Sequence, residues 1–353
     1  MKKRNVRKDD SASVQKPTKL QQQKKEKTPT SWKKIILLSL GAVAMLGFSV
    51  KILPELIQQA VFMYRLRLPY FADLSQPADF SLNHTINLYL SPEEGISLGV
   101  WLTVPDLRWK EAQGKDLDWY EKALGDGNPV FIYFHGNTKN RAAPHRIGVL
   151  KVLSALGYHV VVPDYRGFGD STGEITEEGA TTDSLYVYNW VKARSGSSLV
   201  VIWGHSLGTA LSTNVAVKLL EKGVVLDGVI LEGTFNAARS KIPVNPLIWF
   251  YFTLPGIKYL FIGEGSLLQS PPFPTEENLK KMKSPILFLH AEDDSSVPIE
   301  TAETLYEIAA SFQNKDRVKM VRFDGTLKGG YLHNGLYRDA ELPGVIKDFV
   351  ASL

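Results

Sequence analysis

Along most of the chain, hydrophobic residues occur in two patterns, as short continuous runs and at helical spacing. Apolar runs of five or six residues, bounded by polar turns, predict strands at 83–90, 96–104, 129–134, 159–162, 199–203, 228–232, 285–290 and 318–323. Apolar residues at helical spacing predict helices at 144–156, 180–194, 206–222, 299–311 and 342–350. Short buried strands separated by helices are typical of a mostly parallel sheet that is covered by helices on both faces. The pattern therefore predicts an α/β fold over residues 83–353.

The N-terminal pattern is different. Residues 35–50 contain no charge, and the apolar stretch extends to residue 53 if Lys51 snorkels toward lipid headgroups. A helix of about 19 residues is roughly 28 Å long, close to the hydrocarbon thickness of about 30 Å. We expect a single transmembrane helix over 35–53 and a juxtamembrane linker over 54–82. A cleaved signal peptide is the alternative, but its basic region would be unusually long.

Charge is unevenly distributed around this apolar stretch. The chain carries a net charge of +4, but residues 1–34 hold twelve basic and three acidic side chains, about +9, which leaves about −5 for the rest. The composition of the tail, rich in Lys, Gln, Ser and Thr, predicts disorder. The positive-inside rule places this tail in the cytosol and everything after residue 53 across the membrane. Because the basic residues form a tail and not a face, no nucleic-acid partner is expected.

Two further features bear on the compartment and on the available chemistry. Asn83, His84 and Thr85 form an N-x-S/T sequon in the part that we expect to be translocated, so Asn83 is a candidate glycosylation site. The chain has no cysteine, which excludes disulfides, thiolate metal sites and a cysteine nucleophile. We expect no cofactor.

The motif Gly204-His205-Ser206-Leu207-Gly208 lies where an apolar predicted strand would turn into a helix. A serine on such a tight turn has a strained backbone, and residues without Cβ let neighbouring chain pass close to it. A glycine-bracketed serine that merely caps a helix is the alternative. The strand before the motif and the helix after it favour Ser206 as a covalent nucleophile.

A serine hydroxyl is a weak nucleophile, so it needs a base to take its proton and an acid to orient that base. Downstream of Ser206, the predicted strand 285–290 ends in a polar turn with three acidic residues, 292–294. His333 lies 39 residues beyond Asp294, in a glycine-rich loop between the last predicted strand and the last predicted helix. The residues indicate His333 as the base and one of the three acids as its partner.

Acyl transfer also requires backbone N–H groups directed at the developing oxyanion. Leu207, directly after the nucleophile, supplies one such group by its position. The second is expected from the loop after the strand 129–134, and we assign it to the N–H of Asn137.

These motifs together resemble the α/β-hydrolase superfamily from about residue 83 to the C-terminus, in which nucleophile, acid and base follow in this order. More closely, the chain resembles the single-pass membrane lipases of the α/β-hydrolase domain-containing protein 12 group. The resemblance rests on the tail, membrane anchor and sequon, followed by the segments 135–137, 164–171, 203–209, 290–298 and 330–333.

The resemblance implies a triad of Ser206, Asp294 and His333, because the superfamily usually places its acid four residues before the proline that corresponds to Pro298. It implies a type II protein of the endoplasmic reticulum membrane with a lumenal catalytic domain. The implied reaction is cleavage of fatty acyl esters of lysophospholipids, above all lysophosphatidylserine, and of monoacylglycerols. The chain departs from the pattern at Lys139, where related enzymes commonly have glycine, and this bears on the second oxyanion donor.

The segment 236–276 breaks the alternation of strands and helices. It is aromatic and apolar, it is interrupted by prolines, and it is too short to cross a bilayer. We expect an inserted cap that forms an acyl-binding roof or a membrane-contacting lid, with additional buried core as the alternative.

Three functional hypotheses remain. The first is a membrane-anchored serine lipase acting through an acyl-enzyme. The second is a protein-depalmitoylating thioesterase, amidase or peptidase with the same triad. The third is a non-enzymatic receptor or scaffold, which an intact nucleophile, acid and base in order argue against. The sequence does not indicate an oligomeric state.

Overall fold

The computed structural model describes residues 32–41, 72–234, 236 and 273–353. The chain divides into two units, Met1–Ile52 and Leu53–Leu353, and the sheet lies in the second. The remaining parts of the predicted transmembrane helix (42–53), linker (54–71) and cap (237–272) lie outside the described residues.

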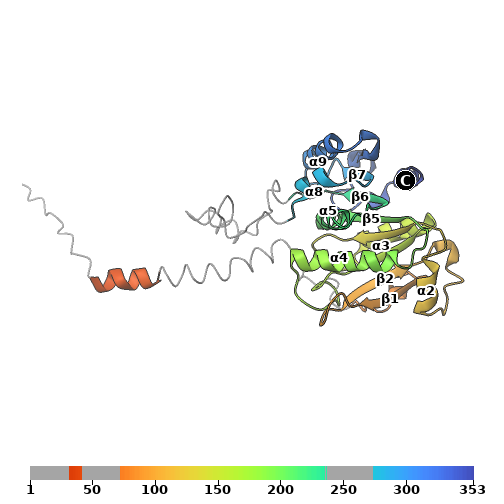
Figure 1. The fold of residues 1–353 in the computed structure, drawn as a ribbon, viewed down its shortest axis with the longest axis horizontal. Coiled ribbons are helices and arrows are strands. Elements are labelled where there is room, and N and C mark those ends of the chain that lie inside the picture. The colour runs from red at the N-terminus through yellow and green to blue at the C-terminus, as the bar shows by residue number, and fades with distance from the viewer. Residues whose placement is uncertain (1–31, 42–71, 235, 237–272) are drawn as a thin grey trace, which may run out of the picture. The chain divides into compact units, whose positions relative to one another are not determined.

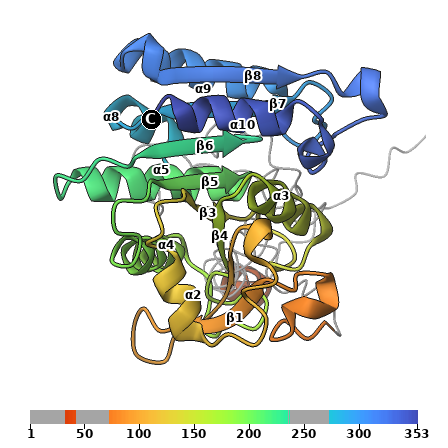
Figure 2. The same ribbon diagram turned by 90° about the vertical axis from the view of Figure 1, so that its right-hand side faces the viewer.

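One sheet of eight strands organises the second unit, in the order β1-β2-β4-β3-β5-β6-β7-β8. The strands are β1 (Thr85–Leu90), β2 (Leu98–Thr103), β3 (Val130–Phe134), β4 (His159–Pro163), β5 (Val200–His205), β6 (Gly228–Glu232), β7 (Ile286–Ala291) and β8 (Val318–Phe323). β1 and β2 are antiparallel to their neighbours, and the six strands β3 to β8 run parallel to one another. Figure 2 shows the strands following one another from β1 to β8. The predicted α/β class is confirmed.

Helices cover both faces of this sheet. The α-helices are α2 (Leu117–Ala123), α3 (Pro144–Ala155), α4 (Glu177–Lys192), α5 (Leu207–Leu220), α8 (Thr275–Lys281), α9 (Ile299–Phe312) and α10 (Leu342–Ala351). Short 3-10 turns occupy Pro77–Phe80, Asp106–Arg108, Lys315–Arg317, Gly325–Lys328 and Leu336–Arg338. α3 and α10 pack on one face, whereas α4, α5, α8 and α9 pack on the other. In Figure 1, α5, α8 and α9 lie together beside β5 to β7.

The inner strands β2 to β7 are buried on both faces, which explains their nearly continuous apolar sequences, whereas the edge strands β1 and β8 are partly exposed. All side chains of β3, β5 and β6 are buried. In such a sheet the carboxyl ends of the parallel strands meet at one edge, where loops can carry chemistry. That edge receives the loops after β3, β5, β6, β7 and β8.

Two helices were not expected from the sequence. α2 has only seven residues, of which Tyr120 and Ala123 are buried, so it offers too few apolar positions for a periodic signal; Asp116 begins it by accepting a hydrogen bond from the N–H of Trp119 at 3.1 Å. α8 is equally short and begins inside the predicted cap segment. A capping side chain also moves a boundary: Thr176 accepts from the N–H of Gly179, so α4 begins three residues earlier than predicted.

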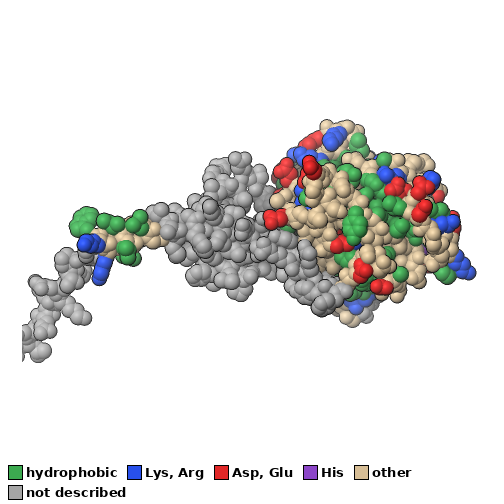
Figure 3. All heavy atoms as spheres, turned by 90° about the horizontal axis from the view of Figure 1, so that it is seen from below, with side chains coloured by type: hydrophobic (Ala, Val, Ile, Leu, Met, Phe, Trp, Pro, Cys, Tyr) green, Lys and Arg blue, Asp and Glu red, His purple; other side chains and the backbone are tan. Residues whose placement is uncertain are grey.

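The described part of the first unit is a helix over residues 32–41. It begins inside the predicted basic tail, and its large apolar side chains are exposed, Trp32 by 79% and Leu37 by 75%. Figure 3 shows these apolar side chains on the helix, with the basic residues gathered near one end. Within the described residues, no helix is both long enough and apolar enough to cross a membrane.

Candidate active site

The turn after β5 holds Ser206 in a strained conformation. Its φ is 53° and its ψ is −118°, at the residue that precedes α5. A Cβ on Gly204 would lie 2.4 Å from the carbonyl oxygen of Gly208, and a Cβ on Gly208 would lie 1.9 Å from the carbonyl oxygen of Phe134. Both glycines of the motif are therefore required by the close approach of backbone, which confirms a tight strand-to-helix turn at Ser206.

Asp294 and His333 are joined by a hydrogen bond of 2.7 Å between Oδ2 and Nδ1. An ionised carboxylate only accepts, so Nδ1 donates and Nε2 is left with its lone pair. The other carboxylate oxygen of Asp294 accepts from the backbone N–H of Ser296 and Val297 at 2.8 and 3.0 Å. Burial would raise the pKa of Asp294, but the His333 hydrogen bond and these N–H groups outweigh it and lower the pKa. This arrangement suits an imidazole that takes a proton at Nε2.

The two neighbouring acids, Asp293 and Glu292, do not hydrogen-bond the imidazole of His333. Asp293 accepts from the backbone N–H of Tyr331 at 2.9 Å and of Leu332 at 3.1 Å, so it anchors the loop that carries His333. The side chain of Glu292 is exposed. Of the three acids in the turn after β7, the structure brings Asp294 to the imidazole.

The end of β6 lies between Ser206 and His333. The backbone N–H of Ser206 donates to the carbonyl oxygen of Glu232 at 2.9 Å. A Cβ on the next residue, Gly233, would lie 3.1 Å from Cε1 of His333 and 3.6 Å from Oδ2 of Asp294. The structure thus brings Ser206, Asp294 and His333 together around the same short piece of backbone at the carboxyl edge of the sheet.

Glu232 is a carboxyl group that the sequence did not single out. Its side chain is 3% exposed and accepts a hydrogen bond of 2.9 Å from the indole N–H of Trp203. Burial raises its pKa to about 7, partly offset by Trp203 and His333. A polar residue at a strand end looks like an ordinary strand terminus, so no sequence signal distinguishes it.

The loop after β3 contacts the turn at Ser206. A Cβ on Gly136 would lie 3.3 Å from the Cβ of Ser206, so Asn137, the next residue, directly follows the contact point. Leu207 is the first residue of α5, and N–H groups in the first turn of a helix have no partner within the helix. The guanidinium of Arg146 donates to the carbonyl oxygens of Gly136 and Thr138, and these hydrogen bonds fix the backbone of this loop.

Lys139, the residue that departs from the superfamily pattern, has a φ of 64°. Glycine adopts this left-handed region without steric cost, whereas lysine is strained there. The loop therefore holds Lys139 in a conformation suited to glycine.

Two other basic side chains near the site are paired with acids. Arg141 is buried and donates to Asp164 at 2.7 Å and to Asp170 at 2.6 Å. Arg166 pairs with Asp183 at 2.6 Å. These arginines tie loops together, and neither presents a free guanidinium to a ligand.

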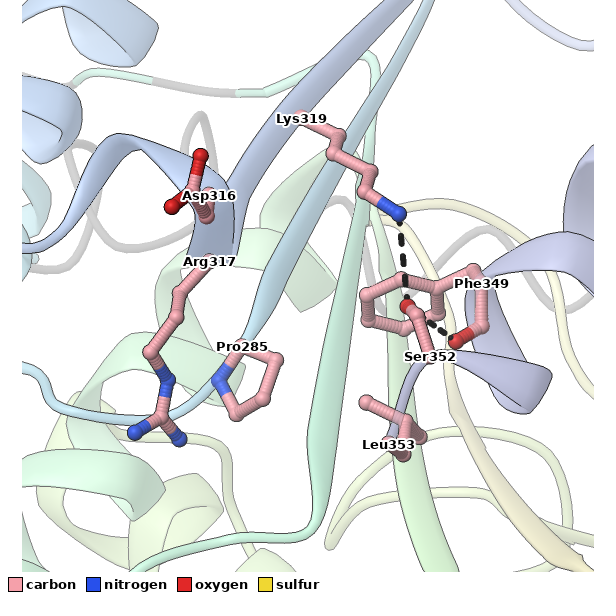
Figure 4. A pocket seen from close by; sticks show the side chains of 7 residues that line it. All are labelled: Pro285, Asp316, Arg317, Lys319, Phe349, Ser352 and Leu353. Carbon is pink, nitrogen blue, oxygen red and sulfur yellow. Dashed lines mark hydrogen bonds between the residues drawn. The ribbon is translucent and has the colours of Figure 1, made fainter.

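A cavity of about 270 Å³ lies away from this site, and Pro285, Arg317, Lys319 and Ser352 are among the residues that line it. In Figure 4 the Lys319 ammonium points to the Ser352 hydroxyl, 3.3 Å away. Pro285 and Arg317 directly precede β7 and β8, so the cavity lies at the amino edge of the sheet, opposite the triad.

Comparisons with known proteins identify the family and the fold. Residues 129–250 match the family model described as alpha/beta hydrolase fold. The chain is 42% identical to lysophosphatidylserine lipase ABHD12 of Danio rerio over 90% of this chain and 83% of that protein. It is 44% identical to lysophosphatidylserine lipase ABHD12 of Xenopus tropicalis over 90% of this chain and 82% of that protein. The chain belongs to the ABHD12 family of α/β hydrolases.

A solved structure, an alpha-beta hydrolase from Vibrio vulnificus, shares the fold with a TM-score of 0.58 at 16% identity, covering 85% of this chain and 93% of that one. Membership of the ABHD12 family and this fold together establish a hydrolase of the esterase and lipase class.

Proposed function

We propose that this ABHD12-family protein is a membrane-anchored serine hydrolase that cleaves the fatty acyl ester of lysophosphatidylserine and of monoacylglycerols. The observation that carries the proposal is the Asp294–His333 hydrogen bond of 2.7 Å at the strained turn of Ser206. The names of the relatives supply the substrate class, because two of them are lysophosphatidylserine lipases.

The reaction proceeds in two halves. Nε2 of His333 takes the hydroxyl proton of Ser206 while Oγ adds to the ester carbonyl, and the N–H groups of Leu207 and Asn137 stabilise the oxyanion. The carbon–oxygen bond to the glycerol then breaks, and His333 returns the proton to the leaving alcohol. Water, deprotonated by His333, attacks the acyl-enzyme, releases the fatty acid and restores Ser206. Asp294 stabilises the imidazolium in both halves.

The proposed membrane anchor is the apolar stretch 35–53, with the basic tail cytosolic and the catalytic unit in the lumen of the endoplasmic reticulum. The exposed apolar side chains of the helix at 32–41 support this, because exposed apolar side chains are stabilised when lipid or protein covers them. Anchoring beside the bilayer raises the local concentration of amphiphilic substrate.

The test is hydrolysis of lysophosphatidylserine by the full-length protein in lipid vesicles. Replacing the nucleophile in Ser206→Ala should lower kcat on the order of a millionfold. The matched control is Ser311→Ala, which removes an exposed hydroxyl of α9 bonded to the carbonyl oxygen of Glu307. Turnover by Ser206→Ala within about tenfold of the wild type would contradict the mechanism.

The leaving group distinguishes the alternative function. The same triad could serve a depalmitoylating thioesterase or an amidase. Competing a long-chain monoacylglycerol with a palmitoyl thioester and a peptide amide on one preparation measures the three values of kcat/KM. We expect the highest kcat/KM for the ester. A higher value for the thioester or the amide would reassign the substrate class while leaving Ser206 as nucleophile.

A further inference from the structure

His205 occupies the variable position of the Gly-x-Ser-x-Gly motif and contacts the loop of the base. It is the last residue of β5 and is 2% exposed. Its Nε2 lies 2.8 Å from the backbone carbonyl oxygen of His333, a residue 128 positions away in the sequence. The centroids of the two imidazole rings are 4.9 Å apart. The residue before the nucleophile therefore touches the main chain of the residue that serves as its base.

The geometry defines the tautomer of His205. A carbonyl oxygen only accepts, so Nε2 carries the proton and donates it to His333. Burial and the charge of the neighbouring His333 imidazole lower the pKa of His205 to about 3, with Arg146 adding to the effect and the hydrogen bond to the His333 carbonyl and Asp294 opposing it. The ring therefore stays neutral, and its donor stays in place, at pH values well above 3.

The other side of the ring faces the loop after β3. A Cβ on Gly136 would lie 3.2 Å from Nδ1 of His205, and the His145 ring at the start of α3 lies 5.4 Å away between centroids. His205 is thus packed between the loop that carries Asn137 and the loop that carries His333. One side chain therefore contacts both loops that border Ser206.

The His333 main chain is consequently held at two successive points. Asp293 binds the N–H groups of Tyr331 and Leu332, and His205 binds the carbonyl of His333. Between these points Leu332 has a φ of 52°, a left-handed conformation that a loop without such anchors would tend to relax. Asp293 fixes the loop to β7, whereas His205 fixes it to the strand that ends in the nucleophile.

We propose that His205 is a positioning residue that sets the distance between Nε2 of His333 and Oγ of Ser206 by hydrogen-bonding the backbone of the base. The inference rests on the proposed triad and goes beyond it, because it gives the variable residue of the motif a role. A displacement of about 1 Å between reacting groups can cost on the order of 100-fold in rate. Movement of the His333 loop by that amount is the expected result of losing this hydrogen bond.

Two substitutions separate positioning from space filling in the full-length protein. His205→Phe keeps a planar ring but has no donor, and His205→Gln retains an N–H that can reach the carbonyl. For a soluble short-chain ester we expect His205→Phe to lose about 10- to 100-fold in kcat with KM changed less than about threefold. His205→Gln should recover most of that loss.

His84 provides the matched control. It is also buried, and its Nε2 lies 2.8 Å from the hydroxyl of Ser154, far from the triad. His84→Phe should lower the thermal midpoint as much as His205→Phe does while leaving kcat within about twofold of the wild type.

A second readout reports the base directly. The rate of fluorophosphonate labelling of Ser206 against pH depends on the ionisation and placement of His333, and the low-field NMR resonance of its Nδ1–H reports the bond to Asp294. In His205→Phe we expect slower labelling and a shifted or broadened resonance, both restored in His205→Gln. Equal activity loss in the Phe and Gln variants, in proportion to their loss of stability and with an unchanged resonance, would overturn the inference.

Labelling also distinguishes this inference from the substrate proposal. A wild type that labels but does not hydrolyse lysophosphatidylserine would overturn the substrate assignment alone, since labelling still measures the effect of His205. A wild type that does not label would overturn the triad, and the role of His205 with it.

Discussion

The adjacent residues Asp293 and Asp294 have different structural roles although they are neighbours in the sequence. Asp294 hydrogen-bonds the imidazole of His333, and Asp293 hydrogen-bonds the backbone of the same loop. Successive side chains leave a turn in different directions, so two identical acids meet different parts of one loop. Sequence spacing gives both residues the same surroundings, and the structure distinguishes them.

Asparagine substitutions at these two positions should therefore differ in kind. Asp294→Asn removes the carboxylate that orients His333 and should lower kcat by about 10,000-fold with little change in the thermal midpoint. Asp293→Asn weakens two bonds to the loop and should lower stability by about 1–2 kcal/mol with a smaller effect on kcat. Steady-state kinetics and thermal unfolding on both variants measure this contrast. A larger loss of kcat in Asp293→Asn would exchange the roles of the two residues.

Glu232 makes a prediction about pH. Its folded pKa of about 7 lies above the value of 4.5 for an ordinary glutamate, so folding favours its protonated form. As pH rises between these two values, the unfolded chain loses its proton first and the folded state becomes progressively less favourable, by up to about 3 kcal/mol above pH 7.

Glu232→Gln removes this penalty while keeping an acceptor for the indole of Trp203. The thermal midpoint of the variant should exceed that of the wild type at about pH 8, and the difference should shrink toward about pH 5. Calorimetry across this range measures it. A constant difference at every pH would show that folding does not raise the pKa of Glu232.

At the scale of elements, apolar runs predicted most of the sheet and the long helices well. Strand positions agree within about two residues because β3 to β7 are buried on both faces and nearly every residue in them is apolar. The helices α2 and α8 were not predicted, because each has only seven residues, about two helical turns, and this is too short to show a periodic pattern of apolar residues.

The candidate site also contains residues that the sequence could predict and residues that it could not. Ser206, Asp294 and His333 could be proposed from local motifs and from the order of nucleophile, acid and base. The contacts of Glu232 and His205 could not, because they join residues that meet through the fold: Glu232 pairs with His205 across β6 and β5, and His205 meets His333 from another strand end. Tertiary hydrogen bonds of this kind leave no periodic pattern.

The loop after β3 offers a prediction about local strain. Lys139→Gly should stabilise the protein by about 0.5–1 kcal/mol, because glycine relieves the left-handed strain and this gain exceeds its greater entropy loss on folding. The matched control, Lys151→Gly, lies in α3 and should lose about 1 kcal/mol. Urea midpoints of both variants test this. Destabilisation by Lys139→Gly would mean that the lysine side chain contributes more than the strain costs.

At the scale of the whole molecule, charge and apolar surface are separated along the chain. The basic tail is followed by an apolar stretch, and the net acidic remainder carries the sheet and the proposed triad. In the proposed topology the tail faces an anionic cytosolic leaflet, the apolar stretch lies in lipid, and the catalytic unit lies in water beside the opposite leaflet. The proposed orientation rests on this order and predicts one chemical consequence, at Asn83.

Asn83 is exposed at the start of β1, and its backbone carbonyl accepts from the side chain of Gln113 at 2.9 Å, so the peptide is ordered while the amide side chain is free to be modified. If the catalytic unit is lumenal, Asn83 should carry an endoglycosidase-sensitive glycan that Asn83→Gln abolishes and Thr85→Ser, which keeps the sequon, retains. The catalytic unit in sealed microsomes should also resist added protease until detergent is present. Digestion of the catalytic unit in intact microsomes would reverse the orientation and place Ser206 on the cytosolic side, where the glycan could not form.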